Sequence, residues 1–280
     1  MTPEQKRARL VELLAADEIL LLPGAFNAAS AKLVQQTGFE AVYVSGSATA
    51  GAVFGLPDVG LVDLATAVAE GERIASAVDL PTIADADTGF GNVAEAVRLF
   101  EAAGISALHI EDQVFPKRCG HLEGKQVIPL GEMVEMISAA VTARVDPGFQ
   151  LIARCDARSV TSFDDLLDRC LAYQQAGADL LFPEALVSLE EFEATVEAVD
   201  VPVLANMTEF GKTPYFTAEQ FEQAGVSAVL FPLTAFRAAM GEVERTLIEL
   251  KAAGGQESII SRMQSRQAFY DLIDYDSYDS

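Results

Sequence analysis

Apolar and polar positions along this chain follow one recurring pattern. An amphipathic segment ends in a glycine and a short apolar run begins a few residues later, as at Gly38, Gly104, Gly177 and Gly225. A glycine just past a helix often takes the left-handed conformation that ends it. A short apolar run with β-branched residues is typical of a buried parallel strand. The pattern therefore predicts repeated units of helix, cap and strand.

The apolar runs predict eight strands, which we expect at Ile19–Gly24, Ala41–Ser45, Pro81–Ala86, Ala107–Glu111, Gln150–Arg154, Leu180–Pro183, Pro202–Ala205 and Ala228–Phe231. Between them, the clearest helices are expected at Val93–Ala103, Gly131–Arg144, Ser162–Ala176 and Leu189–Val199. Strands that alternate with helices in this way favour an α/β fold of the (β/α)8 TIM-barrel type.

A doubly wound open sheet is the alternative fold. It requires a glycine-rich phosphate-binding turn after an early strand, and the nearest candidate, Thr88–Asn92, lacks that spacing. No linker or low-complexity segment divides the chain, so we expect one domain over residues 1–280. Residues 256–280 have the composition of a polar-apolar helix and an Asp/Tyr/Ser tail, and we expect them to form an appendage outside the barrel.

The chain is strongly acidic. It carries 42 Asp and Glu against 19 Lys and Arg, a net charge of −23, which argues against nucleic acid or an anionic membrane as a partner. One interpretation is a solvated acidic surface. Another is adaptation to a salt-rich (halophilic) cytoplasm, because salt screens the self-repulsion of such a surface. In either case, an anionic substrate needs a local patch of positive charge.

Membrane insertion and secretion are not expected from the sequence. No run of about 18 apolar residues lacks a charge, and the charged segment Met1–Glu12 contains no apolar secretory core. The cysteines, Cys119, Cys155 and Cys170, have neither paired nor metal-binding spacing. Thiols of this kind fit a reduced, cytoplasmic protein.

Against this acidic background, the run Lys117-Arg118-Cys119-Gly120-His121 combines two cations, a thiol and one of the chain's two histidines. Nearby cations lower the pKa of a thiol, so Cys119 is a candidate acid/base residue. Apolar packing is the usual alternative for a free cysteine, and a nucleophilic role is also open. The run indicates a site that holds an anion and moves a proton.

In a barrel of this type, catalytic residues lie at the carboxyl ends of the strands. There the sequence has Asp85, Asp87 and Glu111. Asp85 and Asp87 point to the same face of a strand, and two close carboxylates repel unless a cation or a proton separates them. The three carboxylates therefore predict a site for Mg²⁺ or Mn²⁺. Asp87 alone could instead cap the helix that follows it.

Further residues at strand ends are candidate substrate contacts. Arg154 can clamp a carboxylate through its planar fork, or can form an ion pair with Glu184 or Asp156. Ser45-Gly46-Ser47 can present backbone N–H groups to an anion. Asp58 is either a turn cap or a residue that supports the site from behind.

At these residues the chain resembles the isocitrate lyase and phosphoenolpyruvate mutase superfamily, and within it most closely the 2-methylisocitrate lyases. The resemblance spans nearly the whole chain. The motifs that carry it are Tyr43-Val44-Ser45-Gly46, Gly55-Leu56-Pro57-Asp58, Asp85-Ala86-Asp87-Thr88-Gly89-Phe90-Gly91, Glu111-Asp112-Gln113, Lys117 to His121, Phe182-Pro183-Glu184-Ala185, Ala205 to Gly211, Phe231-Pro232-Leu233 and Met263 to Arg266. The Cys-Gly-His core is specific to the lyase branch.

The resemblance implies a role for each of these residues. Asp85 would bind Mg²⁺ directly or through water, with Asp87 and Glu111 supporting it through water. Cys119 would be the acid/base residue, and Tyr43 and His121 are further candidate catalytic residues. The α-keto acid part of a di- or tricarboxylate substrate would be held by Ser45, Gly46 and Arg154. The dicarboxylate part would be surrounded by Lys117, Arg118, His121, Glu184 and Asn206, with Ser47, Gly120, Thr208 and Leu233 as additional contacts.

The implied reaction is a Mg²⁺-dependent retro-aldol (Claisen-type) cleavage, which would convert 2-methylisocitrate to pyruvate and succinate. Tyr43 and a metal-activated group are the candidate bases for the substrate hydroxyl. Segments on either side of the Cys119 run also occur in superfamily members that act on 2,3-dimethylmalate or oxaloacetate, and isocitrate is a further alternative substrate. The resemblance also implies a homotetramer that exchanges its C-terminal helix between subunits, and a loop around Cys119 that closes over substrate.

Overall fold

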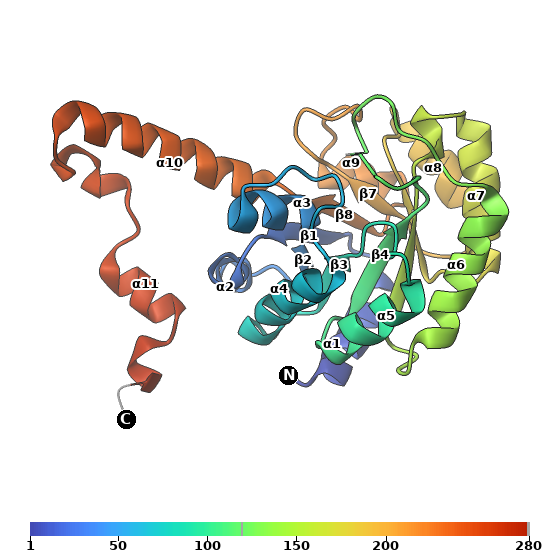
Figure 1. The fold of residues 1–280 in the computed structure, drawn as a ribbon, viewed down its shortest axis with the longest axis horizontal. Coiled ribbons are helices and arrows are strands. Elements are labelled where there is room, and N and C mark those ends of the chain that lie inside the picture. The colour runs from blue at the N-terminus through green and yellow to red at the C-terminus, as the bar shows by residue number, and fades with distance from the viewer. Residues whose placement is uncertain (119, 279–280) are drawn as a thin grey trace.

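The computed structural model describes residues 1–118 and 120–278, and these residues form an α/β barrel (Figure 1). The strands are parallel and neighbour one another in the order β6-β5-β4-β3-β2-β1-β8-β7. Each predicted strand is confirmed to within a few residues; the observed bounds are β1 Leu20–Ala25, β2 Val42–Val44, β3 Thr82–Asp85, β4 Ala107–Glu111, β5 Gln150–Cys155, β6 Leu180–Pro183, β7 Leu204–Asn206 and β8 Ala228–Phe231.

The barrel is nearly closed. In the described residues, β6 and β7 are joined by one isolated bridge between Leu181 and Val203 and by a hydrogen bond from the Leu181 N–H to the Pro202 carbonyl (3.0 Å). The strand predicted to begin at Pro202 begins at Leu204 instead. Proline has no N–H to donate to a strand ladder, which explains the late start.

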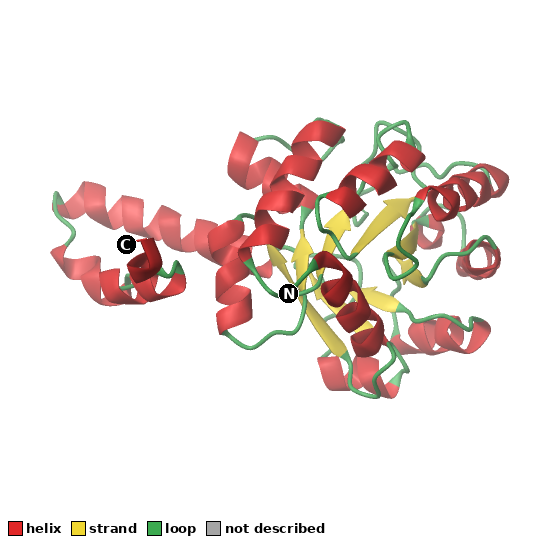
Figure 2. Cartoon of the chain, turned by 90° about the horizontal axis from the view of Figure 1, so that it is seen from below, coloured by secondary structure: helices red, strands yellow, loops and turns green. Residues whose placement is uncertain are grey.

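Helices surround the strands on the outside (Figure 2). The four glycines predicted to end helices are all left-handed, with φ of 89° at Gly38, 84° at Gly104, 101° at Gly177 and 79° at Gly225. The four helices predicted most clearly correspond to α5 to α8. The helices and helical turns are α1 Pro3–Leu14, α2 Ala28–Gln36, α3 Gly46–Thr49, η1 Ala50–Phe54, α4 Leu64–Ala77, α5 Val93–Ala102, α6 Leu130–Ala143, η2 Ala157–Ser159, α7 Phe163–Gln175, α8 Leu189–Ala198, α9 Ala218–Gln223, α10 Thr234–Ala253, η3 Glu257–Arg262, α11 Arg266–Leu272 and η4 Tyr275–Tyr278.

Helix α1 packs across the amino-terminal end of the barrel. Leu10 and Leu14 are buried there and cluster with inward-facing apolar residues of the strands. The ammonium of Lys6 donates to the carbonyls of Ala75 (2.7 Å) and Val78 (2.6 Å), which lie just before β3. Because this end is filled by packed side chains, the opposite end, where the strands finish, is the one available for a site.

After β8 the chain leaves the barrel. Helix α10 has no buried residue and reaches away from the barrel, and the chain then turns back so that α11 lies beside α2 (Figure 1). The polar-apolar helix expected within residues 256–280 is not continuous, because Ser265 starts a new helix by accepting the Ala268 N–H (3.1 Å). None of the helices in the described part of the chain is both long and apolar enough to cross a membrane.

Candidate active site

A cavity of about 50 Å³ opens at the carboxyl ends of the strands. Most of the candidate residues line it: Tyr43, Ser45, Ser47, Asp58, Asp85, Lys117, Arg118, Gly120, His121, Arg154, Glu184, Asn206, Thr208 and Leu233. Gly46 and Asp87 line a neighbouring pocket, and Glu111 is buried against Arg154. Cys119 lies outside the described residues.

Two of the three carboxylates lie at the end of β3, where Asp85 is the last strand residue and Asp87 stands two positions later. The Asp87 N–H donates to Asp85 Oδ1 (3.0 Å), and Asp87 itself has a left-handed backbone with φ 46°. The alternative role of Asp87 as a helix cap is wrong, because Asn92 caps the following helix α5. Gly46 packs against the same group: a Cβ there would lie 2.7 Å from Asp85 Oδ2, so only glycine leaves this carboxylate room.

Two carboxylates of this cluster have surroundings that disfavour their ionised forms. Burial raises the pKa of Glu111 well above its usual value, and neither carboxylate oxygen has a hydrogen-bond partner among the described residues. Burial, and then the charge of Asp85, raise the pKa of Asp87 to about 6. Groups with these raised pKa values favour a nearby cation.

Lys117 places a buried ammonium group in this cluster. Its Nζ contacts Asp58 and lies 2.6 Å from Asp87 Oδ1. Burial alone would lower the pKa of Lys117, but the surrounding carboxylates, with Glu111 the strongest, hold it well above its usual value. Lys117 therefore stays charged, and Asp58 acts in this structure as its partner.

The donor set suits a magnesium ion bound partly through water. Within residues 1–118 and 120–278, no three His, Cys, Asp or Glu side chains converge closely enough to ligate one ion directly. Mg²⁺ usually keeps several waters and takes one or two carboxylates. Asp85 lines the cavity and can be such a ligand. Glu111, whose Oε2 forms an ion pair with Arg154 (3.2 Å), makes no hydrogen bond in the described residues and can accept one from water at Oε1.

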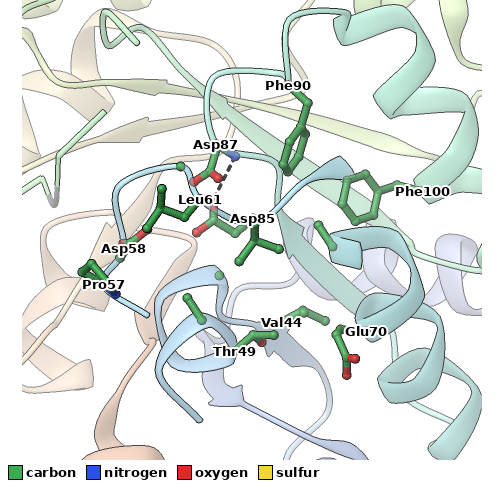
Figure 3. Close-up of a pocket in the computed structure, with 15 residues that line it drawn as sticks. Val44, Thr49, Pro57, Asp58, Leu61, Glu70, Asp85, Asp87, Phe90 and Phe100 are labelled. Atoms are coloured by element: carbon green, nitrogen blue, oxygen red, sulfur yellow. Dashed lines mark hydrogen bonds between the residues drawn. The ribbon is translucent and has the colours of Figure 1, made fainter. Parts of the chain in front are cut away.

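A second pocket lies beside Asp85 and Asp87 (Figure 3). Its walls are largely apolar and include Leu61, Phe90 and Phe100. Apolar surroundings strengthen electrostatic interactions because they lower the local dielectric. The apolar walls of this pocket therefore strengthen the attraction between the two carboxylates and a nearby cation.

Tyr43 is hydrogen-bonded to a buried histidine. Its Oη lies 2.7 Å from Nε2 of His109, and the same nitrogen is 3.5 Å from Asp85 Oδ1. Burial lowers the pKa of His109 to about 4, so the ring is neutral. Burial, and then the charge of Asp85, raise the pKa of Tyr43 well above its usual value. These surroundings favour Tyr43 as a hydrogen-bond donor over Tyr43 as a base.

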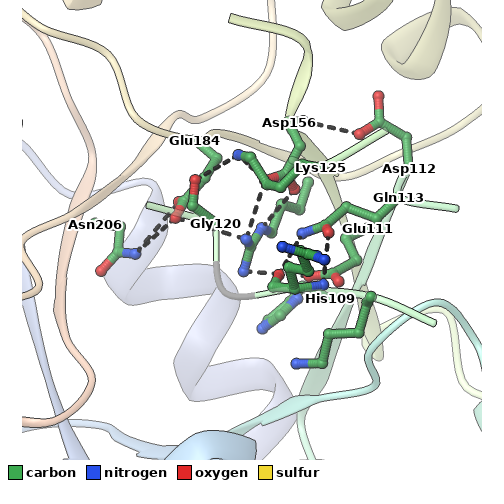
Figure 4. A network of polar contacts seen from close by, with 12 residues as sticks. His109, Glu111, Asp112, Gln113, Gly120, Lys125, Asp156, Glu184 and Asn206 are labelled. Carbon is green, nitrogen blue, oxygen red and sulfur yellow. Dashed lines mark hydrogen bonds and ion pairs between the residues drawn. The ribbon is translucent and has the colours of Figure 1, made fainter. Parts of the chain in front are cut away.

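Arg154 is held in a fixed orientation by buried carboxylates, of which Asp156 and Glu184 are labelled in Figure 4. Its Nε and Nη2 lie 2.9 and 3.2 Å from the two oxygens of Asp156, and Nη2 is 3.5 Å from Glu184 Oε1. The guanidinium also lies over the ring of Phe182, 5.2 Å from its centroid. The ion pairs considered as an alternative for Arg154 are thus present, and they orient a guanidinium that lines the cavity.

His121, Glu184 and Asn206 form a second polar wall. The Lys212 N–H donates to His121 Nδ1 (2.9 Å), so the ring proton lies on Nε2, which is 3.0 Å from Glu184 Oε1. Asn206 Nδ2 donates to the same carboxylate at 3.2 and 3.3 Å. Burial would raise the pKa of Glu184, but Arg154 and His121 hold it well below its usual value. Glu184 is therefore ionised and orients the polar groups around it.

Two predicted substrate contacts are engaged with the protein itself. The Ser45 hydroxyl accepts the Ala48 N–H (3.1 Å) and caps the short helix α3. The Arg118 guanidinium donates to the Glu123 carbonyl (3.2 Å). Both residues border the cavity, but neither side chain is directed by these bonds toward a ligand.

Three buried residues that shape the site were not selected from the sequence as site residues: His109, Lys125 and Asp156, of which Asp156 was considered only as an ion-pair partner of Arg154. A signal exists for two of them, because His109 stands two positions before Glu111 and Asp156 two positions after Arg154, which puts each pair on one face of a strand. Lys125 gives no such signal, since its contacts depend on the path of the loop after β4.

Comparisons with known proteins identify the family. The model of the phosphoenolpyruvate phosphomutase family matches residues 10–251. The chain is 46% identical to a probable 2-methylisocitrate lyase of Corynebacterium glutamicum, over 100% of this chain and 92% of that protein. It is 47% identical to a 2-methylisocitrate lyase of Aeropyrum pernix, over 96% of this chain and 88% of that protein. The chain belongs to the phosphoenolpyruvate mutase/isocitrate lyase superfamily.

Solved structures from this superfamily share the fold. Oxaloacetate acetylhydrolase in complex with 3,3-difluorooxalacetate has a TM-score of 0.93 at 30% identity, covering 100% of this chain and 96% of that chain. For 2,3-dimethylmalate lyase the TM-score is 0.92 at 32% identity, with 100% and 94% covered. Phosphonopyruvate hydrolase complexed with oxalate and Mg²⁺ gives 0.87 at 29% identity, with 100% and 97% covered. The resemblance carried by the sequence motifs is confirmed.

Proposed function

We propose that this chain is a carbon–carbon lyase that cleaves 2-methylisocitrate to pyruvate and succinate. Full-length relatives that bear the name 2-methylisocitrate lyase support the reaction. The observation that carries the proposal is the convergence of Asp85, Lys117, His121 and Arg154 on one cavity. A dicarboxylate substrate, an oxygen-binding metal and a proton transfer require this combination of groups.

The buried cations bind the carboxylates of the substrate. Arg154, whose Nε and Nη2 are held by Asp156, presents its remaining N–H groups and its positive charge to the α-keto acid part. Lys117 binds the part that becomes succinate, and His121, whose Nε2 proton is directed at Glu184, borders that part. In a chain with a net charge of −23, these groups provide the local positive potential that an anionic substrate requires.

Mg²⁺ is the proposed cofactor, with Mn²⁺ as an alternative. Asp85 would hold it, and Asp87 and Glu111 would support it through water. When bound, the ion acts as a Lewis acid that stabilises negative charge on the keto acid oxygen. The raised pKa values of Asp87 and Glu111 support a cation here, as does the Mg²⁺ in the structure of phosphonopyruvate hydrolase.

Cys119 is the proposed acid. A base takes the proton of the substrate hydroxyl, the C–C bond breaks, and the carbanion next to the carboxylate takes a proton from the thiol to give succinate. The thiolate then regains a proton, so none is gained or lost over the cycle. Tyr43 is better suited to donate a hydrogen bond to substrate than to accept the hydroxyl proton, because its pKa is raised. His121 keeps its Nε2 proton directed at Glu184 and thereby orders the polar wall that it forms with Glu184 and Asn206.

A panel of 2-hydroxy di- and tricarboxylates tests the proposal. Pyruvate release from 2-methylisocitrate is expected with Mg²⁺, and it should be lost on chelation and in Cys119→Ser. Cys170→Ser is the control, since Cys170 is a buried residue of α7 outside the cavity. Cleavage of isocitrate, 2,3-dimethylmalate or oxaloacetate, with 2-methylisocitrate inert, would replace the proposed substrate. Full activity in Cys119→Ala would indicate chemistry without a cysteine acid.

We also propose a homotetramer in which the C-terminal helices are exchanged between subunits. Met240, Val243 and Leu247 lie on one face of α10 and are 50%, 48% and 58% exposed. An apolar face on a helix that reaches away from its own barrel is suited to cover by a second subunit. Light scattering should give the mass of four chains, and Leu247→Glu should lower it. A monomeric wild-type protein would contradict the proposal.

The cellular setting is proposed from composition. We propose that the protein works in a reduced, salt-rich cytoplasm and has neither nucleic acid nor membrane as a partner. We also propose that residues 1–280 form a single domain, with residues 256–280 as its appendage. Cys155 and Cys170 are free and buried, as suits a protein that needs no disulfide.

A further inference from the structure

Lys125 is a buried cation in a hairpin that follows β4. In this hairpin, Gln113 pairs with Val127 and the Val114 N–H donates to the Gln126 carbonyl (2.8 Å). The Lys125 side chain is 2% exposed, whereas most lysines keep their ammonium in water. Because an unpaired buried charge is strongly destabilising, the partners of Lys125 indicate its role.

These partners come from two different segments (Figure 4). Nζ lies 2.7 Å from Asp156 Oδ1, just past the end of β5, and it also donates to the Gly120 carbonyl. The ammonium of Lys125 therefore joins the loop that carries the Lys117–His121 run to the wall of the barrel.

Asp156 is a rigid anchor for this link. Its backbone N–H donates to Asp112 Oδ1 (2.8 Å), and Asp112 Oδ2 accepts from Tyr173 Oη (2.7 Å). The same Asp156 carboxylate accepts from Nε and Nη2 of Arg154, at 2.9 and 3.2 Å. Lys125 and Arg154 thus share one carboxylate, so the loop and the guanidinium are positioned against the same fixed group.

The position of Gly120 leaves no space for a side chain. A Cβ at Gly120 would overlap both Glu184 Oε1 and Arg154 Nη2, so the loop backbone lies directly against these two side chains. Gly120 is joined by its peptide bond to Cys119. Any displacement of the Gly120 carbonyl therefore also displaces the residue that the proposed reaction uses as its acid.

We propose that Lys125 is a positioning residue for the lyase reaction. It ties the Gly120 carbonyl to Asp156 and so holds the loop backbone at Gly120 against Arg154 and Glu184. This inference rests on the proposed function. It assigns the buried ammonium a role in setting the distance between the proton donor and the substrate, and Lys125 itself need not touch the substrate.

The variant Lys125→Met tests this, because methionine keeps an unbranched side chain and removes the donor. We expect kcat to fall roughly 10- to 100-fold, since small misplacements of a catalytic group are that costly. KM should change little, because Asp156 still holds Arg154. Lys125→Arg, which restores a cation, should recover part of kcat. The control is Lys32→Met, at a lysine of helix α2 that does not line the cavity, and this variant should behave like the wild type.

A second measurement requires no substrate. Alkylation of Cys119 by iodoacetamide, followed by peptide mapping over several pH values, reports how well the loop is held; buried Cys155 and Cys170 are internal references. Faster alkylation in Lys125→Met, with the kcat loss, supports the proposal. A lower Tm with unchanged kcat and alkylation rate overturns it, because Lys125 would then only neutralise Asp156. If the wild type cleaves nothing in the panel but alkylation is still accelerated, the proposed function fails and the seating of the loop by Lys125 stands.

Discussion

The backbone of Gly120 lies against the guanidinium of Arg154 with no space for a side chain between them. Arg154 cannot yield, because Asp156 holds both Nε and Nη2. Glu184 limits the same position from another side. This packing holds the loop after β4 against Arg154 and Glu184, so a single methyl group at Gly120 should push the loop away from them.

Gly120→Ala should therefore lower kcat/KM by about 100-fold or more, through displacement of the loop. The thermal midpoint should change little, because the barrel core is untouched. Gly131→Ala is the matched control: a Cβ there meets nothing within 4 Å, and Ala in helix α6 should stabilise by about 0.5–1 kcal/mol. Steady-state kinetics and melting curves check both variants. Normal turnover in Gly120→Ala would contradict the packing argument.

Arg154→Lys should lower kcat/KM by roughly 100-fold, because a lysine keeps the charge but loses the planar fork. The inhibition constant of the keto acid product, used as a competitive inhibitor, should also rise, because the variant binds its carboxylate less well. Arg158→Lys serves as the control, since Arg158 makes a similar forked pair with Glu191 (2.7 to 3.0 Å) and does not line the cavity. Equal losses in both variants would show that the fork at Arg154 has no specific role.

Leu10→Ala should reduce the free energy of unfolding by about 2–5 kcal/mol, the usual cost of a cavity in a packed core. Leu10 is fully buried where α1 fills the end of the barrel away from the site. KM should therefore be unchanged. Urea denaturation measures the loss, and Val145→Ala, at a position 83% exposed, should stay within about 0.5 kcal/mol of the wild type. A large KM change in Leu10→Ala would show that the two ends of the barrel are coupled.

Glu184 should contribute stability that depends on pH. Its pKa in the folded chain lies below the value of 4.5 expected when unfolded, so its contribution is fully present above that pH and is lost as the pH falls through the folded pKa. Glu184→Gln should therefore melt below the wild type at about pH 6, and the gap should narrow toward about pH 3. Melting curves across this range check the sign. A gap that stays constant or widens on acidification would refute it.

Salt should stabilise this protein. At about 1 M KCl the Debye length falls to about 3 Å, which screens repulsion between surface carboxylates. With a net charge of −23, the thermal midpoint should rise steadily between low salt and that concentration, and activity should follow. If the midpoint is flat, the acidic surface is merely solvated, and adaptation to a salt-rich cytoplasm is not supported.

Much of the barrel could be predicted from sequence because its signals are local. The left-handed glycines after helices and the apolar runs that follow them depend on only a few neighbouring residues, and the observed strands start and end close to the predicted positions. Asp85, Arg154 and Glu184 were also predictable, because the carboxyl ends of parallel strands converge at one face of a barrel. The late start of β7 at Leu204 and the new helix that begins at Ser265 were not predicted, although each has a local cause, the missing N–H of Pro202 and the cap made by Ser265.

By itself, the sequence determined the fold class, the family motifs and a cavity rich in carboxylates and cations. Only the tertiary structure decided how those groups are paired: Lys117 with Asp58 and Asp87, Tyr43 with His109, and Lys125 with Asp156 and Gly120. The physical reason is that the two kinds of contact depend on different stretches of chain. Backbone periodicity fixes which way a strand residue points, but a long side chain on a loop finds its partner through the path of that loop, and no periodicity along the chain encodes that path.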